Sequence, residues 1–333
     1  MDGNYLGLYL LTGKIEIGEN RFALKNLPEQ TKKSNPRSLK EYECVVREDD
    51  GSKVTRVWYE LPRIPEDITG GYILELTDDY DWYKSRFISE RGISMMLKSQ
   101  PYAAREQVDY IADLWQEFEN ALFAGNGMNE KGKHYSEYID MESFADQWLF
   151  YELNEENSLG SSVYFYKDSD ETGDGRIHAS WMWDLEHSLA RSSAAAMSWF
   201  TAVRNDPDDY WAQFYRHSDF RELVYREWQE KFLPAIEKAL DAETGEDPAG
   251  VSSLDWYLEA YGKDGALEHD RWSSSDLEEK LEKIRKIYEI RKEFLSRSLS
   301  LYENREYEYY YEEDGNFYGV KESGEKDILM ELP

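Results

Sequence analysis

The sequence is poor in cysteine, in basic residues and in long apolar runs, and each shortage excludes a class of protein. The single cysteine, Cys44, permits neither an intrachain disulfide nor a cysteine zinc site. No run of about 18 apolar residues occurs, so we expect no membrane span. Basic residues number 39 against 69 acidic ones, which gives a net charge of −30. Because such a field repels phosphate backbones, we expect no nucleic-acid partner.

The composition indicates a folded protein with a substantial core. Apolar residues make up 41% and aromatic residues 15% of the 333 residues, which argues against global disorder. The length allows one large domain or two ordinary ones. We find no signal peptide, but the turn Asp2-Gly3-Asn4 resembles the end of a hairpin whose first strand is missing. We therefore expect that the natural protein is longer and has residues before Met1.

The first hundred residues favour strands. Alternating or glycine-led apolar segments predict strands within Tyr5 to Ile17, from Val54 to Leu61 and from Gly70 to Leu76. Residues 28–52 are polar and punctuated by proline, and we predict a loop there. Residues 1–100 are thus expected to form a β-rich lobe that lacks its first strands.

Residues 101–300 favour helices, with one hairpin in their middle. Apolar residues at helical spacing predict helices over about 101–123, 141–153, 219–240 and 276–298, with Asp140 as a cap and Pro234 as a kink. Residues 163–166 and 177–183 predict a hairpin. Tyrosine and glutamate alternate beyond residue 300 and predict a small β meander over 301–333, or the start of a further module. The whole pattern predicts an α+β fold.

The loop that joins the central hairpin is acidic. Asp168, Asp170 and Thr172 match the first, third and fifth positions of an EF-hand calcium loop, and Gly173 matches the sixth. Ala179 stands at the twelfth position, where such a loop needs glutamate. An ordinary hairpin turn is therefore favoured over a calcium site.

The block from residue 152 to residue 186 has the order helix end, polar loop, hairpin and aspartate. Protein kinases use this order, because one loop supplies the base and an aspartate beyond a hairpin holds the metal. Asn157 and Ser162 are five residues apart, and Asp184 follows the hairpin. The alternative is that Asp184 caps a helix that begins at Leu185, with Glu186 favourable in its first turn. Spacing alone favours the helix cap.

Several stretches together resemble the CotH kinase family, named for a bacterial spore-coat protein. They extend over most of residues 1–300 and occur in the family's order. They are NYLGLYLLTGKIEIGENR (Asn4–Arg21), GGYILEL (Gly70–Leu76), YIDMESFADQWLFYEL (Tyr138–Leu153), SSVYFYKD (Ser161–Asp168) and WDLEHSL (Trp183–Leu189).

The resemblance implies an atypical protein-kinase-like fold, with a β-rich lobe packed on a mainly helical lobe. It implies transfer of the ATP γ-phosphate to a serine of a coat or surface protein, with Mg²⁺. Asp184 matches the family's metal-binding aspartate, and Glu186 stands where the family usually has a second aspartate. Ser162 and Asp184 are the residues expected near the nucleotide. The family's setting suggests a spore-coat or extracellular location.

Three departures from the family argue against robust activity. Asn157 stands where the family has its catalytic-loop aspartate, and an amide cannot accept a proton as a carboxylate does. Glu156 is adjacent and replaces that aspartate if the loop shifts by one residue. Gly13 stands where the family usually has glutamate, and the lysine-bearing strands expected before Asn4 are missing.

Three interpretations therefore compete. The chain is an active ATP- and Mg-dependent kinase, a catalytically inactive relative that binds or assembles at a spore or cell surface, or a degenerate fragment in which Asp184 only caps a helix. If the chain is active, its acidity favours serine substrates with basic segments.

Overall fold

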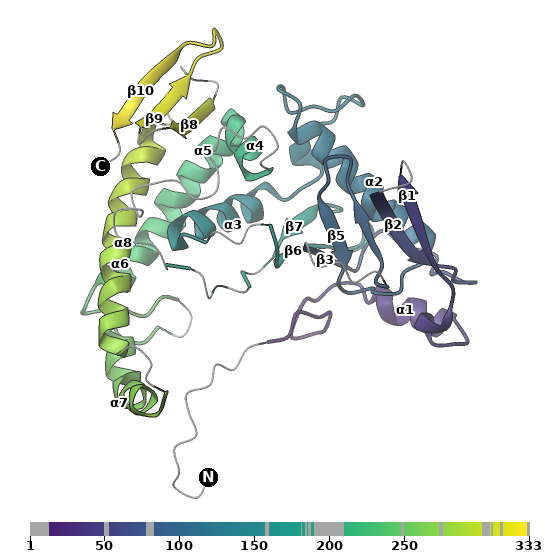
Figure 1. Ribbon diagram of the computed structural model, residues 1–333, viewed down its shortest axis with the longest axis horizontal. Coiled ribbons are helices and arrows are strands. Elements are labelled where there is room, and N and C mark those ends of the chain that lie inside the picture. The colour runs from purple at the N-terminus through teal and green to yellow at the C-terminus, as the bar shows by residue number, and fades with distance from the viewer. Residues whose placement is uncertain are drawn as a thin grey trace, which may run out of the picture.

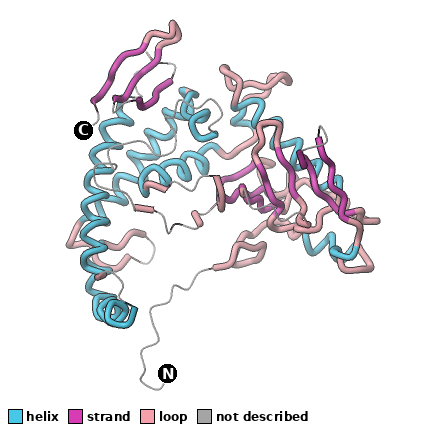
Figure 2. The backbone as a smooth tube through the Cα atoms, in the orientation of Figure 1, coloured by secondary structure: helices cyan, strands magenta, loops and turns pink. Residues whose placement is uncertain are grey.

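A seven-stranded antiparallel sheet lies beside a group of helices, so the chain is α+β (Figures 1 and 2). The computed structural model describes residues 13–49, 53–77, 83–156, 160–180, 182–183, 185, 188–189, 210–247, 250–272, 276–301, 307, 309–313 and 316–331. None of the helices in these ranges is long and apolar enough to cross a membrane.

The strand order of the large sheet is β1-β2-β4-β5-β3-β6-β7, and every neighbouring pair is antiparallel. In the central strand β3, Leu74 lies opposite Leu97 on one side and Phe165 on the other. Every residue of β3 is buried, as expected for a strand covered on both faces. The strands are β1 (Cys44–Asp49), β2 (Lys53–Tyr59), β3 (Tyr72–Leu76), β4 (Arg86–Ile88), β5 (Ser94–Leu97), β6 (Val163–Lys167) and β7 (Ile177–Ala179).

The main core lies between this sheet and helix α2 (Arg105–Leu122). The predicted apolar stripe of α2 is confirmed, because its members are all buried: Val108, Ile111, Trp115, Phe118 and Leu122. The Trp115 ring meets the Phe165 ring of β6 edge-on at 5.1 Å. A shared core of this kind fixes β6, and with it the start of the candidate site.

The remaining helices gather around α8, which extends along the opposite side of the molecule from the sheet (Figure 1). The predicted cap at Asp140 is confirmed, since its side chain accepts from the Ser143 amide of α3. Asp276 caps α8 in the same way and accepts from the Glu278 amide. Pro234 follows a π-helical turn, Trp228–Phe232. The helices are α3 (Met141–Asn154), α4 (Tyr210–Arg216), α5 (Ser218–Glu227), α6 (Leu233–Leu240), α7 (Leu254–Trp272) and α8 (Leu277–Ser300).

The predicted C-terminal meander is present as a second, three-stranded antiparallel sheet at the end of α8 (Figure 1). Its strands are β8 (Tyr309–Glu313), β9 (Asn316–Val320) and β10 (Lys326–Glu331). This sheet contacts α4.

The prediction of a loop over residues 28–52 is wrong. This region contains helix α1 (Leu27–Ser34), a 3₁₀ turn (Leu39–Glu41) and strand β1. Pro28 occupies the first turn of α1, where its missing N–H does no harm, and the Asn26 side chain accepts from the Glu29 amide. The proline that suggested a loop is therefore a helix start.

The expected boundary near residue 100 does not divide the large sheet, because β6 and β7 follow α3 in the chain yet extend the sheet beside β3. A further 3₁₀ turn, Tyr135–Glu137, precedes α3. Of the strand predicted within Tyr5 to Ile17, residues 1–12 lie outside the described residues. The remainder has only an isolated bridge, Ile17 with Phe22, among the described residues.

Candidate functional site

The polar loop in which we place the base begins at the C-terminus of α3, in buried surroundings. Four polar residues of this helix end are at most 7% exposed: Glu152, Asn154, Glu155 and Glu156. Burial of a carboxylate destabilises the fold unless neighbouring groups pair with its charge, so the neighbours of these residues define the site. Burial, together with the Glu156 carboxylate, raises the pKa of the Tyr151 phenol.

Helix α8 supplies two of these neighbours. Arg291 and Glu152 are both fully buried, and Arg291 Nη2 lies 3.0 Å from Glu152 Oε2. The same nitrogen also donates to the Glu152 carbonyl. The Tyr288 hydroxyl donates to Asn154 Oδ1 at 2.8 Å, and burial raises the pKa of Tyr288 to about 12. Helix α8 thus holds the last turn of α3 through hydrogen bonds from Arg291 to Glu152 and from Tyr288 to Asn154.

The chain that follows the central hairpin returns to the same helix end. The Ser188 hydroxyl donates to Glu156 Oε2 at 2.7 Å. The Leu189 amide donates to the Asn154 carbonyl at 2.9 Å. Residues 154–156 and residues 188–189 are therefore in contact, although about thirty residues separate them in sequence.

Left-handed backbone conformations mark this junction. Among the described residues other than glycine, positive φ occurs at Glu155 (55°), Ser162 (59°) and Leu189 (54°). This conformation costs a non-glycine residue about 1–2 kcal/mol. All three residues flank the two segments that meet here. Such strain clusters at functional sites, where the surrounding structure enforces it.

The structure describes two of the five predicted site residues. Glu156 is 2% exposed at the start of the loop, and Ser162 immediately precedes β6. Asn157, Asp184 and Glu186 lie outside the described residues, and so does the predicted cap at Asp184. The contacts that the structure describes here join residues 154–156 to residues 188–189, and the roles of these three residues stay predictions.

The acidic hairpin loop directs its carboxylates to separate partners, as expected for an ordinary turn. Asp168 Oδ1 accepts from the Lys25 amide at 2.9 Å, and Asp170 pairs with the buried ammonium of Lys167 at 2.5 Å. These carboxylates do not converge on one point.

A cluster with the spacing of metal ligands lies at the far end of the same loop. Asp140, Asp174 and His178 offer atoms within 4.8 Å of one another. Although burial opposes it, hydrogen bonds from Arg176 and His178 lower the pKa of Asp174 to about 2. The Arg176 guanidinium lies 2.8 Å from Asp174 and 3.6 Å from Asp140, so a protein cation already balances these carboxylates.

Lys98, which follows β5, is oriented by Glu75 of β3, and Glu75 also contacts Tyr164, two residues beyond Ser162. Tyr164 donates to Glu75 Oε1 at 2.6 Å, and Lys98 donates to Glu75 Oε2 at 2.7 Å. The Lys98 side chain is 39% exposed, so its ammonium is both oriented and open to solvent. Among the described residues only Glu75 accepts from this ammonium, which leaves two of its N–H groups to donate to an anion.

Comparisons of the chain with protein-family models, with curated proteins and with solved structures find no match. Sequence reasoning missed the contributions of Arg291, Tyr288 and Leu189. Arg291 falls among charged residues at helical spacing, and only its place beside the apolar stripe of α8 could have indicated burial.

Proposed function

We propose that the chain is a CotH-like atypical protein kinase that transfers the γ-phosphate of ATP to a serine of a coat or surface protein. The observation that carries the proposal is the convergence of strained segments at the end of α3. Ser188 and Leu189 contact Glu156 and Asn154 there, and Glu155 and Leu189 have left-handed φ. The order helix end, loop, hairpin and returning acidic segment is also the order used in protein kinases.

The residues in the returning segment fit a magnesium ion chemically. Asp184 and Glu186 offer carboxylate oxygens, which are the hard ligands that Mg²⁺ prefers. When bound, the ion would neutralise charge on the transferred phosphate. Asp184 is the main ligand in this proposal and Glu186 the second, while Ser162 lies near the nucleotide at the entrance to β6.

The substrate hydroxyl is assigned to the loop that contains Glu156 and Asn157. Glu156 already accepts a hydrogen bond from Ser188, and its side chain is buried. That geometry favours a role for Glu156 in holding the returning segment. In this proposal Asn157 orients the substrate hydroxyl.

Two substitutions separate these roles. Asn157→Asp supplies the missing carboxylate, so we expect it to raise phosphate transfer to a serine peptide by about 10²-fold or more. Glu156→Gln keeps the size of the side chain and should alter the rate by less than tenfold. A loss of about 10²-fold in Glu156→Gln, with no gain in Asn157→Asp, would assign the base to Glu156 instead.

The second candidate is a catalytically inactive relative that binds or assembles at a spore or cell surface. The amide at Asn157 and the absence of glutamate at Gly13 favour it, because both changes remove charge from the predicted site. In that case the junction at α3 keeps a structural role and the chain acts through its surface.

A calorimetric titration with ATP and Mg²⁺ tests the proposal. We expect binding that requires Mg²⁺ and disappears in Asp184→Ala. The matched control is Glu171→Ala, which removes an exposed carboxylate from the neighbouring hairpin loop and should bind ATP normally. If the intact chain does not bind ATP, the kinase proposal fails and the inactive relative stands.

A further inference from the structure

A cavity of about 640 Å³ lies where three parts of the chain meet. Its walls come from the loop after α2, from the turn between α4 and α5, and from Tyr307 and Glu322 of the C-terminal region, whose sheet adjoins these helices in Figure 1. The volume is in the range of sites that bind small molecules. We call it the α5 cavity, because the first residues of α5, Ser218 and Asp219, lie on its wall.

His217, on this wall, presents a buried acceptor that no described protein group fills. It is 8% exposed, and its Nε2 carries the ring proton, because the Leu122 carbonyl 2.7 Å away can only accept. Burial lowers the pKa of this imidazole, so Nδ1 has a lone pair at neutral pH. Nδ1 does not cap α5 and has no other hydrogen-bond partner among the described residues. It is not sealed inside the protein, so a donor in the cavity can reach it.

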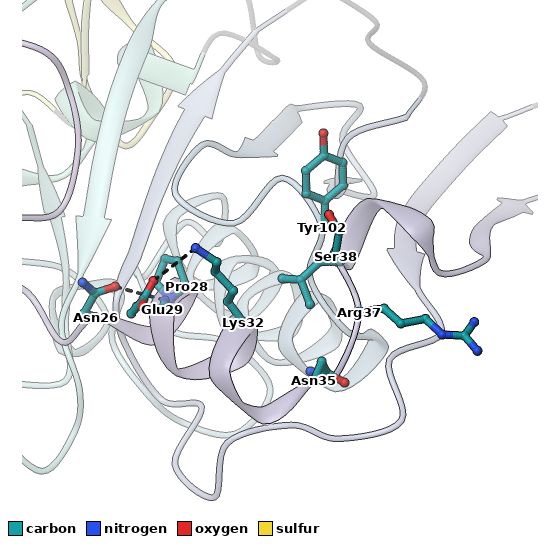
Figure 3. A pocket seen from close by; sticks show the side chains of 9 residues that line it. Asn26, Pro28, Glu29, Lys32, Asn35, Arg37, Ser38 and Tyr102 are labelled. Carbon is teal, nitrogen blue, oxygen red and sulfur yellow. Dashed lines mark hydrogen bonds and ion pairs between the residues drawn. The ribbon is translucent and has the colours of Figure 1, made fainter.

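The cavity beside α1, about 530 Å³ in volume, offers a contrast (Figure 3). The Nδ2 of its buried residue Asn35 donates to the carbonyls of Thr31 and Arg63. The unpartnered Oδ1 of Asn35 is sealed from solvent, so no ligand can bond to it. Lys32 there lies 3.9 Å from Glu29, which already balances its charge. The α5 cavity is therefore the better candidate for a binding site.

A donor and an acceptor in the α5 cavity lie farther apart than a hydrogen bond. The Ser136 amide donates to His134 Nδ1 at 3.3 Å, so the other ring nitrogen, Nε2, carries a proton. Asp219 Oδ1 accepts from the Tyr135 hydroxyl, whereas Oδ2 lies 4.0 Å from His134 Nε2. A hydroxyl group fits between these two atoms, because it can accept from Nε2 and donate to Oδ2.

The charges around the α5 cavity are mixed and balanced, although the whole chain has a net charge of −30. Two arginines and two acids line it: Arg216, Arg221, Asp219 and Glu322. Asn126 adds a further donor, since its Oδ1 already accepts from the Met128 amide. An ionic ligand of either sign would meet a like charge at this wall, whereas a hydroxyl group both donates and accepts. The lining therefore matches a neutral molecule with several hydroxyl groups.

We propose that the α5 cavity binds a neutral sugar through its hydroxyl groups. One hydroxyl donates to His217 Nδ1, a second bridges His134 and Asp219, and a third accepts from Asn126. A sugar ring holds several hydroxyl groups at fixed spacing, so one molecule makes contacts for which separate waters would each lose freedom. This binding is independent of the kinase proposal, because the site at the end of α3 shares no residue with the α5 cavity.

Saturation-transfer NMR on the intact chain tests the proposal with glucose, galactose and mannose. Each hexose is used free and as its methyl glycoside, which represents the end of a longer glycan and so separates the two sources. We expect at least one of these neutral sugars to bind. Neither inorganic phosphate nor methylammonium should displace it, because each is an ion without the hydroxyl pattern of the sugar.

Two substitutions at exposed positions change the hydrogen bonding of the wall. Asn126→Asp keeps the acceptor that Met128 uses and removes the donor, whereas Asp219→Asn replaces a charged acceptor with an amide. Hydroxyl groups use both residues, so each substitution should weaken sugar binding by about fivefold or more. The matched controls, Asn120→Asp on α2 and Asp270→Asn on α7, lie at exposed positions outside the cavity and should bind like the parent chain.

Four outcomes would overturn the proposal. Absence of binding by every hexose and glycoside would mean that water alone fills the cavity. Phosphate that binds the parent chain and binds Asp219→Asn more tightly would mean an anion site. Methylammonium that binds the parent chain and binds Asn126→Asp more tightly would mean a cation site. The ¹⁵N resonance of His217 Nδ1 should shift on addition of sugar, and no shift at a saturating concentration would place the sugar elsewhere.

Discussion

At the scale of the residue, His217 is a base whose protonation the fold opposes. It is 8% exposed at the start of α5, where Nε2 contacts the Leu122 carbonyl at 2.7 Å and the ring stacks on Tyr135. Burial lowers its pKa, and it outweighs the Leu122 hydrogen bond and the charge of Asp219, which act in the opposite direction. The folded state therefore keeps this imidazole neutral at pH values where an unfolded chain begins to bind a proton.

This difference predicts a loss of stability in mild acid. The contribution of His217 is complete above the ordinary histidine pKa of about 6.5 and declines as the pH falls below it, by at most about 1.4 kcal/mol per pH unit. His217→Gln keeps a donor for Leu122 and cannot titrate. We expect its melting temperature to fall less than that of the parent chain between about pH 7.5 and 5.5.

Differential scanning fluorimetry across that pH range measures the effect. His269→Gln, at an exposed position on α7, is the matched control and should follow the parent curve. If His217→Gln lost stability as steeply as the parent chain, another group would be responsible for the acid sensitivity.

At the scale of the element, loss of the buried contact between α8 and α3 should lower the free energy of unfolding strongly. Arg291 and Glu152 are fully buried, so removal of one partner leaves the other's charge in the interior. Breaking such a pair costs about 3–5 kcal/mol. We expect Arg291→Met to lower the free energy of unfolding by that amount in urea denaturation. Lys286→Met, at an exposed position on the same helix, should change it by less than about 0.5 kcal/mol.

A loss below about 1 kcal/mol in Arg291→Met would contradict this picture, because it would mean that the interior compensates Glu152 by other means. The double variant Arg291→Met/Glu152→Leu removes both charges. It should recover part of the loss, since two apolar groups need no compensation.

Periodicity in the sequence predicts the elements that depend on a continuous apolar stripe and fails where that stripe is short. The stripe of α2 and the cap of α3 could be predicted because each depends on residues within a few positions of one another. Helix α1 buries only Leu27 and Thr31, and β4 has three residues, so neither has a repeat long enough to detect. Packing against the sheet and α2 fixes the positions of these two elements.

In the candidate site, too, local features could be predicted and long-range contacts could not. The order of helix end, loop and hairpin could be predicted, because each of these elements is local. Arg291 and Glu152 are 139 residues apart, and Ser188 and Glu156 are 32 apart. No periodic pattern connects residues at such distances, so these contacts required the structure.

At the scale of the whole molecule, the net charge of −30 should make stability depend on salt. Repulsion among like charges opposes the compact state. A rise in NaCl from about 10 mM to about 150 mM shortens the screening length from about 30 Å to about 8 Å. We expect the melting temperature to rise by roughly a few degrees over that range.

Charge variants test whether repulsion causes this rise. Glu259→Lys, at an exposed position on α7, lowers the net negative charge and should raise the melting temperature in low salt. Lys33→Glu increases that charge at an exposed position on α1 and should lower it. Both differences should shrink at about 150 mM NaCl, because screening weakens the field that each substitution alters. A melting temperature that fell with added salt would mean that ion pairs such as Lys231 with Glu227 and Asp146 outweigh the general repulsion.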